Sequence, residues 1–162
     1  MTKASYSAAL REARKLFAYG LAPCPKGHTI RMLGGCPQCD TSRIAYAKRS
    51  RLAGYVYIAK SGQLTKIGFS TDPFNRIYIA NLEGYAGKRD WRVRAQLKSS
   101  NAGQLEIAAH KFLRDYCDST FWVRNSKITY PREVFSCSFE TAKYAVISVM
   151  TGHDLNDLQE FR

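Results

Sequence analysis

The chain has 162 residues, 45% of them hydrophobic, and a formal net charge of +12, so it is long enough for one ordinary domain with a small appendage and is too apolar for wholesale disorder. No stretch is apolar for long enough to span a bilayer or to act as a signal peptide, so we expect neither a membrane-spanning nor an exported protein. The five cysteines are therefore expected to be reduced thiols or metal ligands in a cytoplasmic protein, not a disulfide framework.

The positive charge is concentrated in the first third of the chain. Residues 1–53 hold ten basic and two acidic residues, a net +8, whereas residues 54–162 hold fifteen and eleven, a net +4. This asymmetry predicts a polyanionic partner, most simply nucleic acid, although a soluble protein can also be basic without such a partner. We expect two parts, an N-terminal module over 1–53 and a second domain over 54–162.

The N-terminal module begins with a predicted helix, in which Tyr6, Leu10, Ala13 and Phe17 recur at helical spacing and Gly20 marks the end. A segment rich in Pro, Gly and Cys follows, and then the basic stretch RIAYAKRSRLA over 43–53.

The pattern C-x3-H-x7-C-x2-C predicts a structural zinc site. Its ligands would be Cys24, His28, Cys36 and Cys39, four soft or borderline ligands within sixteen residues. So small a segment, with few large apolar residues, could hardly fold without such a staple, whereas the alternative is a set of unligated cysteines beside an incidental histidine. The basic residues around the site are predicted to grip duplex DNA: Arg31, Arg43, Lys48, Arg49 and Arg51.

The second domain mixes strands and helices without regular alternation, which predicts an α+β fold with a small, antiparallel, three-stranded sheet flanked by helices. We expect a hairpin from residue 54, a helix from Pro73 to about Leu82 capped by Asp72, a strand over 91–99, a short FWV strand over 121–123 and a helix over 139–151.

A further helix is predicted to follow Asn101, which with Gln104 resembles a capping box. Its core stripe would be formed by Leu105, Ala109, Phe112 and Tyr116.

The hairpin GYVYIAKSGQLTKIGFS (54–70) carries polar residues that its fold does not require. With a two-residue loop at Ser61-Gly62, Val56 faces Ile67 and Tyr57 lies opposite Lys66 on the other face. A neighbouring ammonium would lower the pKa of the phenol toward that of a general base. Gly68 would let a phosphate backbone approach the sheet.

Arg76 falls in the first turn of the next helix, where a guanidinium can clamp a phosphoryl oxygen and stabilise developing negative charge. Together with the hairpin, it supplies the parts that phosphodiester hydrolysis needs, apart from a metal ligand.

The residues GYVYI, KIG and an arginine eight positions after that glycine resemble the GIY-YIG endonuclease superfamily over roughly residues 54–125. The segment QLEIAAHKFL is similar to the family's helix with its metal-binding glutamate, here Glu106, and FWV resembles the segment that follows this helix in small bacterial and phage members.

The resemblance implies a role for each matching residue. Tyr57 would be the general base or water-positioning group, Lys66 would stand at the second motif tyrosine, and Arg76 would stabilise charge. Glu106 would hold a single Mg²⁺ or Mn²⁺ ion, and Asn125 would take the place of the family's late asparagine.

Two residues have open interpretations from the sequence itself. Glu106 borders the apolar stripe of its helix, where one carboxylate, substrate phosphate and waters suit magnesium, but it could also be an exposed helix glutamate. His110, one turn further along the same face, either helps to position a phosphate or packs on Trp122.

We therefore expect a metal-dependent DNA endonuclease of a bacterial or phage-related kind, with one active site per chain. Double-strand cleavage would need a homodimer or two sequential nicks. The alternatives are a non-catalytic DNA-binding regulator on the same scaffold and a nuclease directed at RNA, since basic charge does not separate the two nucleic acids.

Overall fold

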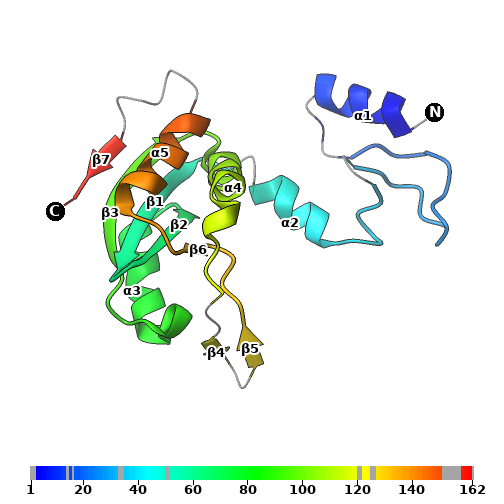
Figure 1. Cartoon of the computed structure of the whole chain (residues 1–162). Helices are drawn as coiled ribbons and strands as arrows, with labels where there is room; N and C mark the ends of the chain where they lie inside the picture. Colours follow the sequence, from blue (N-terminus) through cyan, green and yellow to red (C-terminus); the bar gives the residue numbers. More distant parts are fainter. Residues whose placement is uncertain are drawn as a thin grey trace. The chain divides into compact units, whose positions relative to one another are not determined.

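A computed structural model describes residues 3–13, 15, 17–32, 35–49, 52–119, 122–124, 127–150 and 158–161. The chain divides into two compact units, Met1–Arg49 and Ser50–Arg162, and each is considered by itself (Figure 1). Among the described residues, no helix combines the length and the hydropathy needed to cross a membrane.

Unit 1 holds two short helices, α1 (Lys3–Glu12) and α2 (Ser42–Arg49), joined by a segment with little regular structure. Helix α1 ends at Glu12, well before the Phe17 that the sequence pattern placed in it, and Ala18 instead pairs with Arg31 in an isolated antiparallel bridge. Among its described residues, the buried apolar side chains are those of Leu10, Met32 and Pro37. Unit 1 therefore has very little hydrophobic core.

Unit 2 is built on a five-stranded antiparallel sheet in the order β6-β2-β1-β3-β7. Its strands are β1 (Gly54–Ser61), β2 (Leu64–Ser70), β3 (Arg92–Ser99), β6 (Val134–Phe135) and β7 (Leu158–Glu160). The α+β class is confirmed, but the expectation of three strands is wrong, because β6 pairs with the outer edge of β2 and β7 with that of β3. Strands of two or three residues are too short to show an alternating pattern.

The β1–β2 hairpin has the predicted faces and a different register. Tyr57 lies opposite Gly68, and Lys66 lies opposite Ala59, so the predicted pairing of Tyr57 with Lys66 is wrong. The loop is Gly62-Gln63, with Gly62 at a φ of 54°, one step further along than the predicted Ser61-Gly62. Moving a two-residue loop by one position shifts the pairing by two residues, which preserves the side of the sheet on which each side chain lies.

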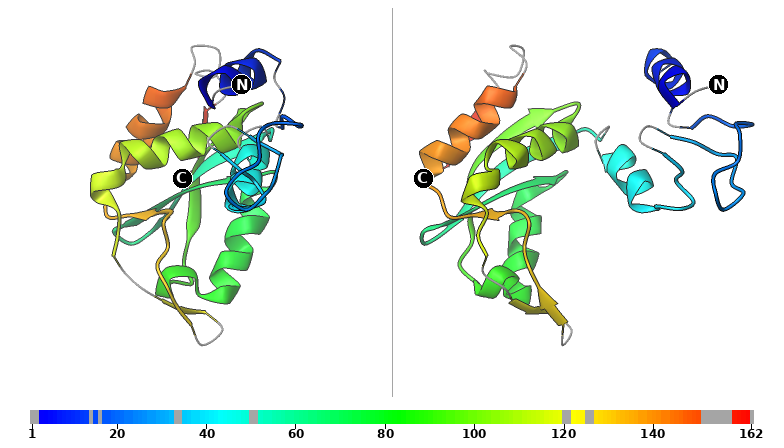
Figure 2. Two further views of the ribbon diagram at one scale, coloured as in Figure 1. Left: turned by 90° about the vertical axis from the view of Figure 1, so that its right-hand side faces the viewer. Right: turned by 45° about the vertical axis from the view of Figure 1, so that its right-hand side comes forward.

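The helices of unit 2 cover both faces of this sheet (Figure 2). They are α3 (Pro73–Glu83), α4 (Ala102–Phe112) and α5 (Phe139–Val149), with the single 3-10 turns η1 (Tyr85–Gly87) and η2 (Arg114–Tyr116). Helix α3 begins as predicted: the Asp72 side chain accepts a hydrogen bond from the Asn75 amide at 3.0 Å, and Pro73 is the first helical residue.

Each face of the sheet has its own hydrophobic cluster. Val56 and Ile58 of β1 pack with α4 and α5, whereas Tyr57 and Ala59 pack on the α3 side. In β3, a register shift opposite Ile58 and Ala59 leaves Arg94 as an extra residue, so Val93 and Ala95 lie in different clusters. In a regular strand, without this extra residue, Val93 and Ala95 would lie on the same face.

Helix α4 differs from the sequence pattern at both ends. Asn101 does not cap the helix with its side chain; its Oδ1 accepts a hydrogen bond from the Ser99 hydroxyl at 2.6 Å. Phe112 and Tyr116, expected in the core, are 47% and 46% exposed, and the fully buried residue at this end is Leu113.

A separate two-stranded ribbon, β4 (Trp122–Arg124) with β5 (Lys127–Thr129), leaves the body of unit 2 between α4 and β6. The predicted FWV strand corresponds to β4, except that Phe121 lies outside the described residues. This ribbon is not part of the main sheet.

Candidate active site and metal centre

Tyr57 lies in the middle of β1, with 1% of its surface exposed, and its ring covers Gly68 on the neighbouring strand. A Cβ atom built on Gly68 would stand 2.5 Å from both the Cζ and the Oη of Tyr57. Glycine is therefore needed at this position to make room for the phenol ring. The expectation that Gly68 opens the sheet to a phosphate backbone is wrong, because Tyr57 fills that space.

Lys66 points from β2 to the same side of the sheet and is also 1% exposed. Its ammonium forms an ion pair with Glu133 and lies 4.6 Å from the ring centroid of Tyr85 and 5.9 Å from that of Tyr57. Burial lowers the pKa of Lys66, and the Glu133 carboxylate opposes that change. The lysine is thus a buried cation held between one carboxylate and two aromatic faces.

Glu133 reaches Lys66 through the pairing of β6 with β2. Val134 lies opposite Lys66 in that pair, and the Ile67 amide donates to the Glu133 carbonyl at 3.2 Å. This backbone contact fixes the residue whose side chain binds the lysine.

The pKa of Tyr57 is raised above its usual value, chiefly because the side chain is buried. The nearby Glu133 and Glu106 carboxylates raise it further, while Arg76 lowers it through its charge and a side-chain hydrogen bond. The expected lowering of this pKa is therefore wrong: desolvation and two anions outweigh the nearby cation. At neutral pH, Tyr57 is an uncharged phenol.

Arg76 is exposed on the first turn of α3, and the Asp72 cap at the start of that helix positions the turn. Its interaction with Tyr57 brings a solvent-facing guanidinium to the buried phenol. Arg76 is therefore the solvent-exposed member of this pair.

Glu106 lies on α4 and is 1% exposed, which contradicts its interpretation as an exposed helix glutamate. Its charge raises the pKa values of Tyr57, Tyr85 and Lys66. The carboxylate thus acts on the same group of side chains, although α4 and Tyr57 belong to clusters on opposite faces of the sheet.

His110, one turn after Glu106, forms a hydrogen bond from Nε2 to the Ile67 carbonyl oxygen at 2.9 Å. Its ring lies 5.4 Å from that of Phe135, whereas Trp122 packs on Tyr85 at 5.1 Å. The histidine therefore packs on Phe135, not on Trp122 as one interpretation expected. Asn125 lies outside the described residues.

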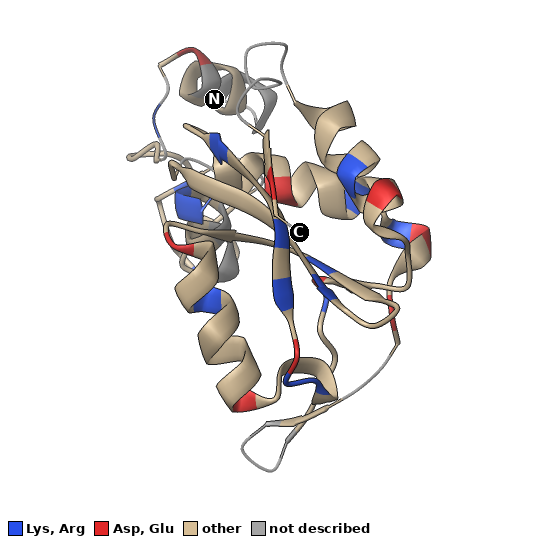
Figure 3. Cartoon of the chain, turned by 90° about the vertical axis from the view of Figure 1, so that its left-hand side faces the viewer, with Lys and Arg blue, Asp and Glu red and all other residues tan. Residues whose placement is uncertain are grey.

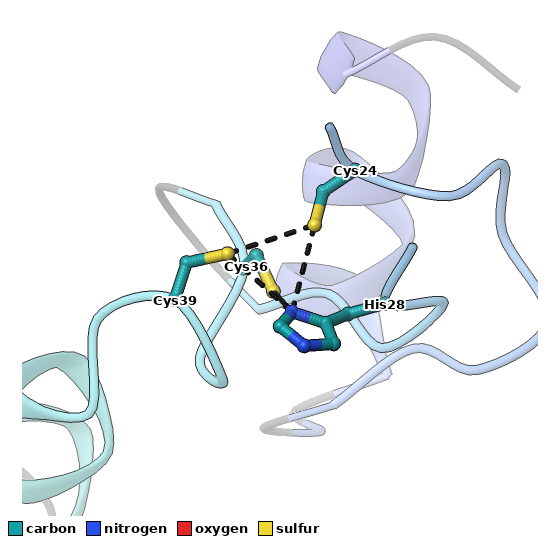
Figure 4. A group of neighbouring side chains, drawn as sticks. All are labelled: Cys24, His28, Cys36 and Cys39. Atoms are coloured by element: carbon teal, nitrogen blue, oxygen red, sulfur yellow. Dashed lines mark hydrogen bonds between the residues drawn. The ribbon is translucent and has the colours of Figure 1, made fainter. Parts of the chain in front are cut away.

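Cys24, His28, Cys36 and Cys39 converge in unit 1 (Figure 4), and their ligand atoms all lie within 4.8 Å of one another. The three sulfur atoms are 3.4–3.6 Å from His28 Nδ1, and the Cys24 and Cys39 sulfurs are 3.6 Å apart. Ligands at ordinary Zn–S and Zn–N distances around a tetrahedral ion would be separated by about 3.5–3.8 Å. These four residues can hold a zinc ion, with His28 bound through Nδ1.

The local chain geometry supports this cluster. The Cys24 amide donates to the His28 carbonyl at 2.9 Å, and the Gly27 amide to the Cys24 carbonyl at 2.7 Å, so the first two ligands share one tight turn. Gly27, with a φ of 81°, provides the left-handed residue of that turn. The pKa of Cys39 is raised to about 11, mainly because its thiol is hydrogen-bonded to Cys24. A bound cation would lower this pKa, because it stabilises the thiolate.

Arg31, predicted to contact DNA, donates hydrogen bonds to three backbone carbonyls, those of Ala22, His28 and Ile30, at 2.6–2.9 Å. It thereby braces the loop that carries Cys24 and His28. Lys48 is exposed and Arg49 half-buried in the last turn of α2, which begins three residues after Cys39. The side chain of Arg43 and all of Arg51 lie outside what the structure describes.

Charged residues of both signs are interspersed in unit 2 (Figure 3). Figure 3 shows Lys and Arg on α3, α5 and the strands, with Asp and Glu among them. In unit 2 the buried charged residues among those described are Lys66 and Glu106, and Glu133, the partner of Lys66, is partly exposed.

Residues 54–150 match the T5orf172 domain. The chain belongs to this family. It is a nuclease-related family, and the match runs from β1 through α5, so it contains Tyr57, Lys66, Arg76, Glu106 and Glu133. No curated protein and no solved structure matches the chain.

Within the T5orf172 domain, two side chains next to the predicted residues escaped the sequence analysis. Tyr85 follows Gly84, which ends α3 in a left-handed conformation, and Glu133 is separated from Lys66 by 67 positions. The only signal for Glu133 is that it is the single acidic residue between Asp118 and Glu140. A lone acid in a basic segment could have been paired with the buried lysine of the KIG motif.

The T5orf172 domain thus combines a neutral phenol, a buried lysine–glutamate pair, a solvent-facing arginine and a buried carboxylate. An arginine beside a phenol can bind a phosphate and orient a water molecule next to it. The carboxylate offers the hard oxygen ligand that Mg²⁺ prefers. The cysteine–histidine cluster lies outside the matched residues.

Proposed function

We propose that the chain is a metal-dependent DNA endonuclease of the GIY-YIG type, which hydrolyses phosphodiester bonds at one site on its T5orf172 domain. The observation that carries the proposal is the convergence of Tyr57, Lys66 and Glu133: Lys66 pairs with Glu133 and lies 5.9 Å from the ring centroid of Tyr57, whose phenol interacts with Arg76. A nuclease-related family supports the same conclusion. A domain that only bound DNA would not need to bury Tyr57, Lys66 and Glu106 from three different elements, at a cost in stability.

The chemistry assigned to each side chain follows from its surroundings. Tyr57, a neutral phenol at physiological pH, accepts a hydrogen bond from the attacking water and orients it toward phosphorus. Arg76, exposed at the mouth of the site, binds a non-bridging oxygen and stabilises the charge that develops on it. Their contact sets the distance between water and phosphate.

Lys66 acts from within the fold as a fixed positive charge, and we assign Glu133 as the residue that positions it. The carboxylate keeps the ammonium in one place, and the ring of Tyr85 supports it from another direction. Such an arrangement gives a cation that need not reorganise when negative charge develops on the substrate.

Glu106 is the residue that would hold a divalent ion, Mg²⁺ or Mn²⁺. The donor is a carboxylate oxygen, and its negative charge is enclosed in the fold, where a cation would offset it. A divalent ion bound there would neutralise charge on the leaving oxygen. Substrate phosphate and water would supply the remaining ligands.

Unit 1 is assigned to DNA binding. Zinc held by the Cys24–Cys39 cluster would fix the loop that leads into α2, and α2 carries Lys48 and Arg49 in its last turn. The charge of +8 over residues 1–53 favours contact with a duplex backbone. With one site per chain, cleavage of both strands would require a homodimer or two successive nicks.

The test is nicking of supercoiled plasmid DNA by the purified full-length chain with Mg²⁺ or Mn²⁺. We expect Glu106→Gln and Tyr57→Phe to reduce the rate at least about a hundredfold while binding to the same DNA persists. Glu140→Gln, which changes an exposed glutamate at the start of α5, is the matched control and should cut normally.

Two outcomes would contradict the proposal. If both variants cut as fast as the parent, the site is elsewhere; if the parent binds DNA but cuts under no divalent ion, the chain is a non-catalytic binding protein. Parallel incubation with duplex DNA, single-stranded DNA and RNA of the same sequence tests the choice of substrate.

A further inference from the structure

The β4–β5 ribbon combines a firm attachment to the body of unit 2 with an apolar face that solvent can reach. It is a two-stranded antiparallel hairpin in which Val123 lies opposite Ile128 and Arg124 opposite Lys127. Figures 1 and 2 show it projecting from the body of unit 2 beyond α3 and the main sheet.

One side of the ribbon is anchored. Trp122 is buried, and its ring packs on Tyr85 at 5.1 Å with an interplanar angle of 64°. Tyr85 in turn carries the Lys66 ammonium over its ring at 4.6 Å. On the exit side, the chain runs from β5 through Pro131, which is buried, to Glu133, the partner of Lys66. Both ends of the ribbon are thus tied to the candidate active site.

The other side of the ribbon faces solvent. Val123, Ile128 and Tyr130 are 63%, 64% and 62% exposed. Val123 and Ile128 are direct cross-strand partners and therefore lie on one face of the ribbon, and Tyr130 follows just after β5. Exposed β-branched residues grouped in this way on a projecting hairpin indicate a binding surface.

The charge of this segment identifies the partner. Residues 119–132 contain Arg124, Lys127 and Arg132 and no acidic residue. A second copy of the same ribbon would bring like charges together, whereas a duplex offers phosphates to these basic residues. The major groove accommodates a two-stranded ribbon and exposes the C5-methyl groups of thymine between its phosphate walls.

From these features we infer that the β4–β5 ribbon enters the major groove of duplex DNA and that Val123 and Ile128 contact thymine methyl groups there. This inference rests on the proposed nuclease function and adds a surface that determines where the domain binds. The Trp122–Tyr85–Lys66 contacts then hold the ribbon at a set position relative to the scissile phosphate. Base preference near the cut would come from this hairpin, while unit 1 contributes contacts to the backbone.

The experiment uses the full-length chain carrying Glu106→Gln, so that binding is measured without cleavage. The duplex is a mixed-sequence fragment, prepared with thymidine or with deoxyuridine throughout, which differ only in the C5-methyl group. The test variant adds Val123→Thr and Ile128→Thr, which keeps branched residues suited to a strand and makes the face polar. The matched control adds Val123→Ile and Ile128→Val, which preserves the apolar face.

We expect the threonine variant to bind the thymidine duplex at least about tenfold more weakly, because two apolar contacts are lost. The control should bind like its parent. Deoxyuridine should weaken binding of the parent and the control several-fold, and should make no difference to the threonine variant. A normal thermal transition for the threonine variant would show that it is folded.

Three outcomes would overturn the inference. Equal binding by the threonine variant and its parent would remove the ribbon from the interface and leave the nuclease function intact. Equal binding of the parent to both duplexes would exclude the methyl contact. If the threonine substitutions instead dissociate a dimer, seen by sedimentation velocity, with DNA affinity unchanged, the ribbon is a contact between copies. Failure of the unsubstituted chain to bind or cut any duplex would reject the proposed function itself.

Discussion

Units 1 and 2 are stabilised by different kinds of interaction. Unit 2 buries two apolar clusters on either side of a five-stranded sheet. Unit 1 has Leu10, Met32 and Pro37 as its buried apolar residues among those described, and four metal-ligating side chains gathered at one point. A unit with so small a core depends on a staple, whereas a well-packed unit can tolerate ionisable groups in its interior. The buried ionisable residues of the candidate active site, Tyr57, Lys66 and Glu106, all lie in unit 2.

The largest expected effect is the loss of the metal from unit 1. Cys36→Ser should abolish zinc binding and unfold unit 1, because zinc binding contributes about 10–16 kcal/mol to the folding of such small modules. Unit 2 should keep its structure, since none of its clusters includes these residues. Zinc content and the amide NMR spectrum of the full-length chain measure both effects.

The control for this prediction is Cys117→Ser, which removes an exposed thiol from unit 2. It should leave zinc content and both parts of the spectrum unchanged. Well-dispersed signals from residues of unit 1 in the Cys36→Ser protein would refute the dependence of this unit on metal.

The next effect concerns the buried ion pair of unit 2. Glu133→Gln should reduce the free energy of unfolding by about 3 kcal/mol at pH 7, because it leaves Lys66 buried without its counter-ion. Adding Lys66→Met should recover most of the lost free energy of unfolding, since the double variant buries no unpaired charge. Chemical denaturation of the three proteins measures these differences.

The stability of the Glu133→Gln variant should also depend on pH in a specific way. Burial lowers the pKa of Lys66, so between its folded pKa and the usual 10.5 the unfolded chain binds more protons, and stability rises with pH there. Because Glu133 opposes this lowering, its removal widens the pH window downward. The deficit of Glu133→Gln should therefore shrink as the pH is raised from 7 toward 10. A deficit that grows over this range would contradict the assignment of Lys66 as a buried cation.

A smaller change in stability is expected for Gly68→Ala, together with a large change in activity. The new methyl group would meet the Tyr57 ring at 2.5 Å and displace it, costing about 1–3 kcal/mol. We expect the rate of DNA nicking to fall about a hundredfold because the phenol moves away from Arg76. Gly54→Ala is the control: its Cβ would meet the Phe69 ring at 2.7 Å, a comparable clash outside the site. Equal activity losses in the two variants would indicate a general packing defect.

The smallest effect is expected at the helix caps. Asp72→Ala and Ser138→Ala each remove a side-chain acceptor bonded to a backbone amide at 3.0 Å, and each should cost about 1 kcal/mol in thermal unfolding. Only Asp72→Ala should slow nicking, by a few-fold, because α3 carries Arg76 one turn later. A slower Ser138→Ala enzyme would show that activity follows stability alone.

Local sequence patterns predicted those features of the fold and site that depend on neighbouring residues. The Asp72-Pro73 helix start, the faces of the β1–β2 hairpin and the spacing of Cys24, His28, Cys36 and Cys39 all depend on short-range geometry. The α+β class follows from the same patterns. Because a two-residue shift preserves the alternation of side chains, the pattern specified the faces and left the register open.

Contacts between distant segments decided the rest. Tyr57 was expected beside a cation that lowers its pKa. It is instead buried against Gly68, and its pKa is raised by burial and by two carboxylates, one supplied by α4 and the other by the residue before β6. Lys66 finds its partner 67 positions away, through a strand too short to be recognised in the sequence. By itself, the sequence determined which chemical groups are present and on which side of an element each lies. Only the tertiary structure decided which of them meet and how far water is excluded, because desolvation and charge pairing depend on the whole packed fold.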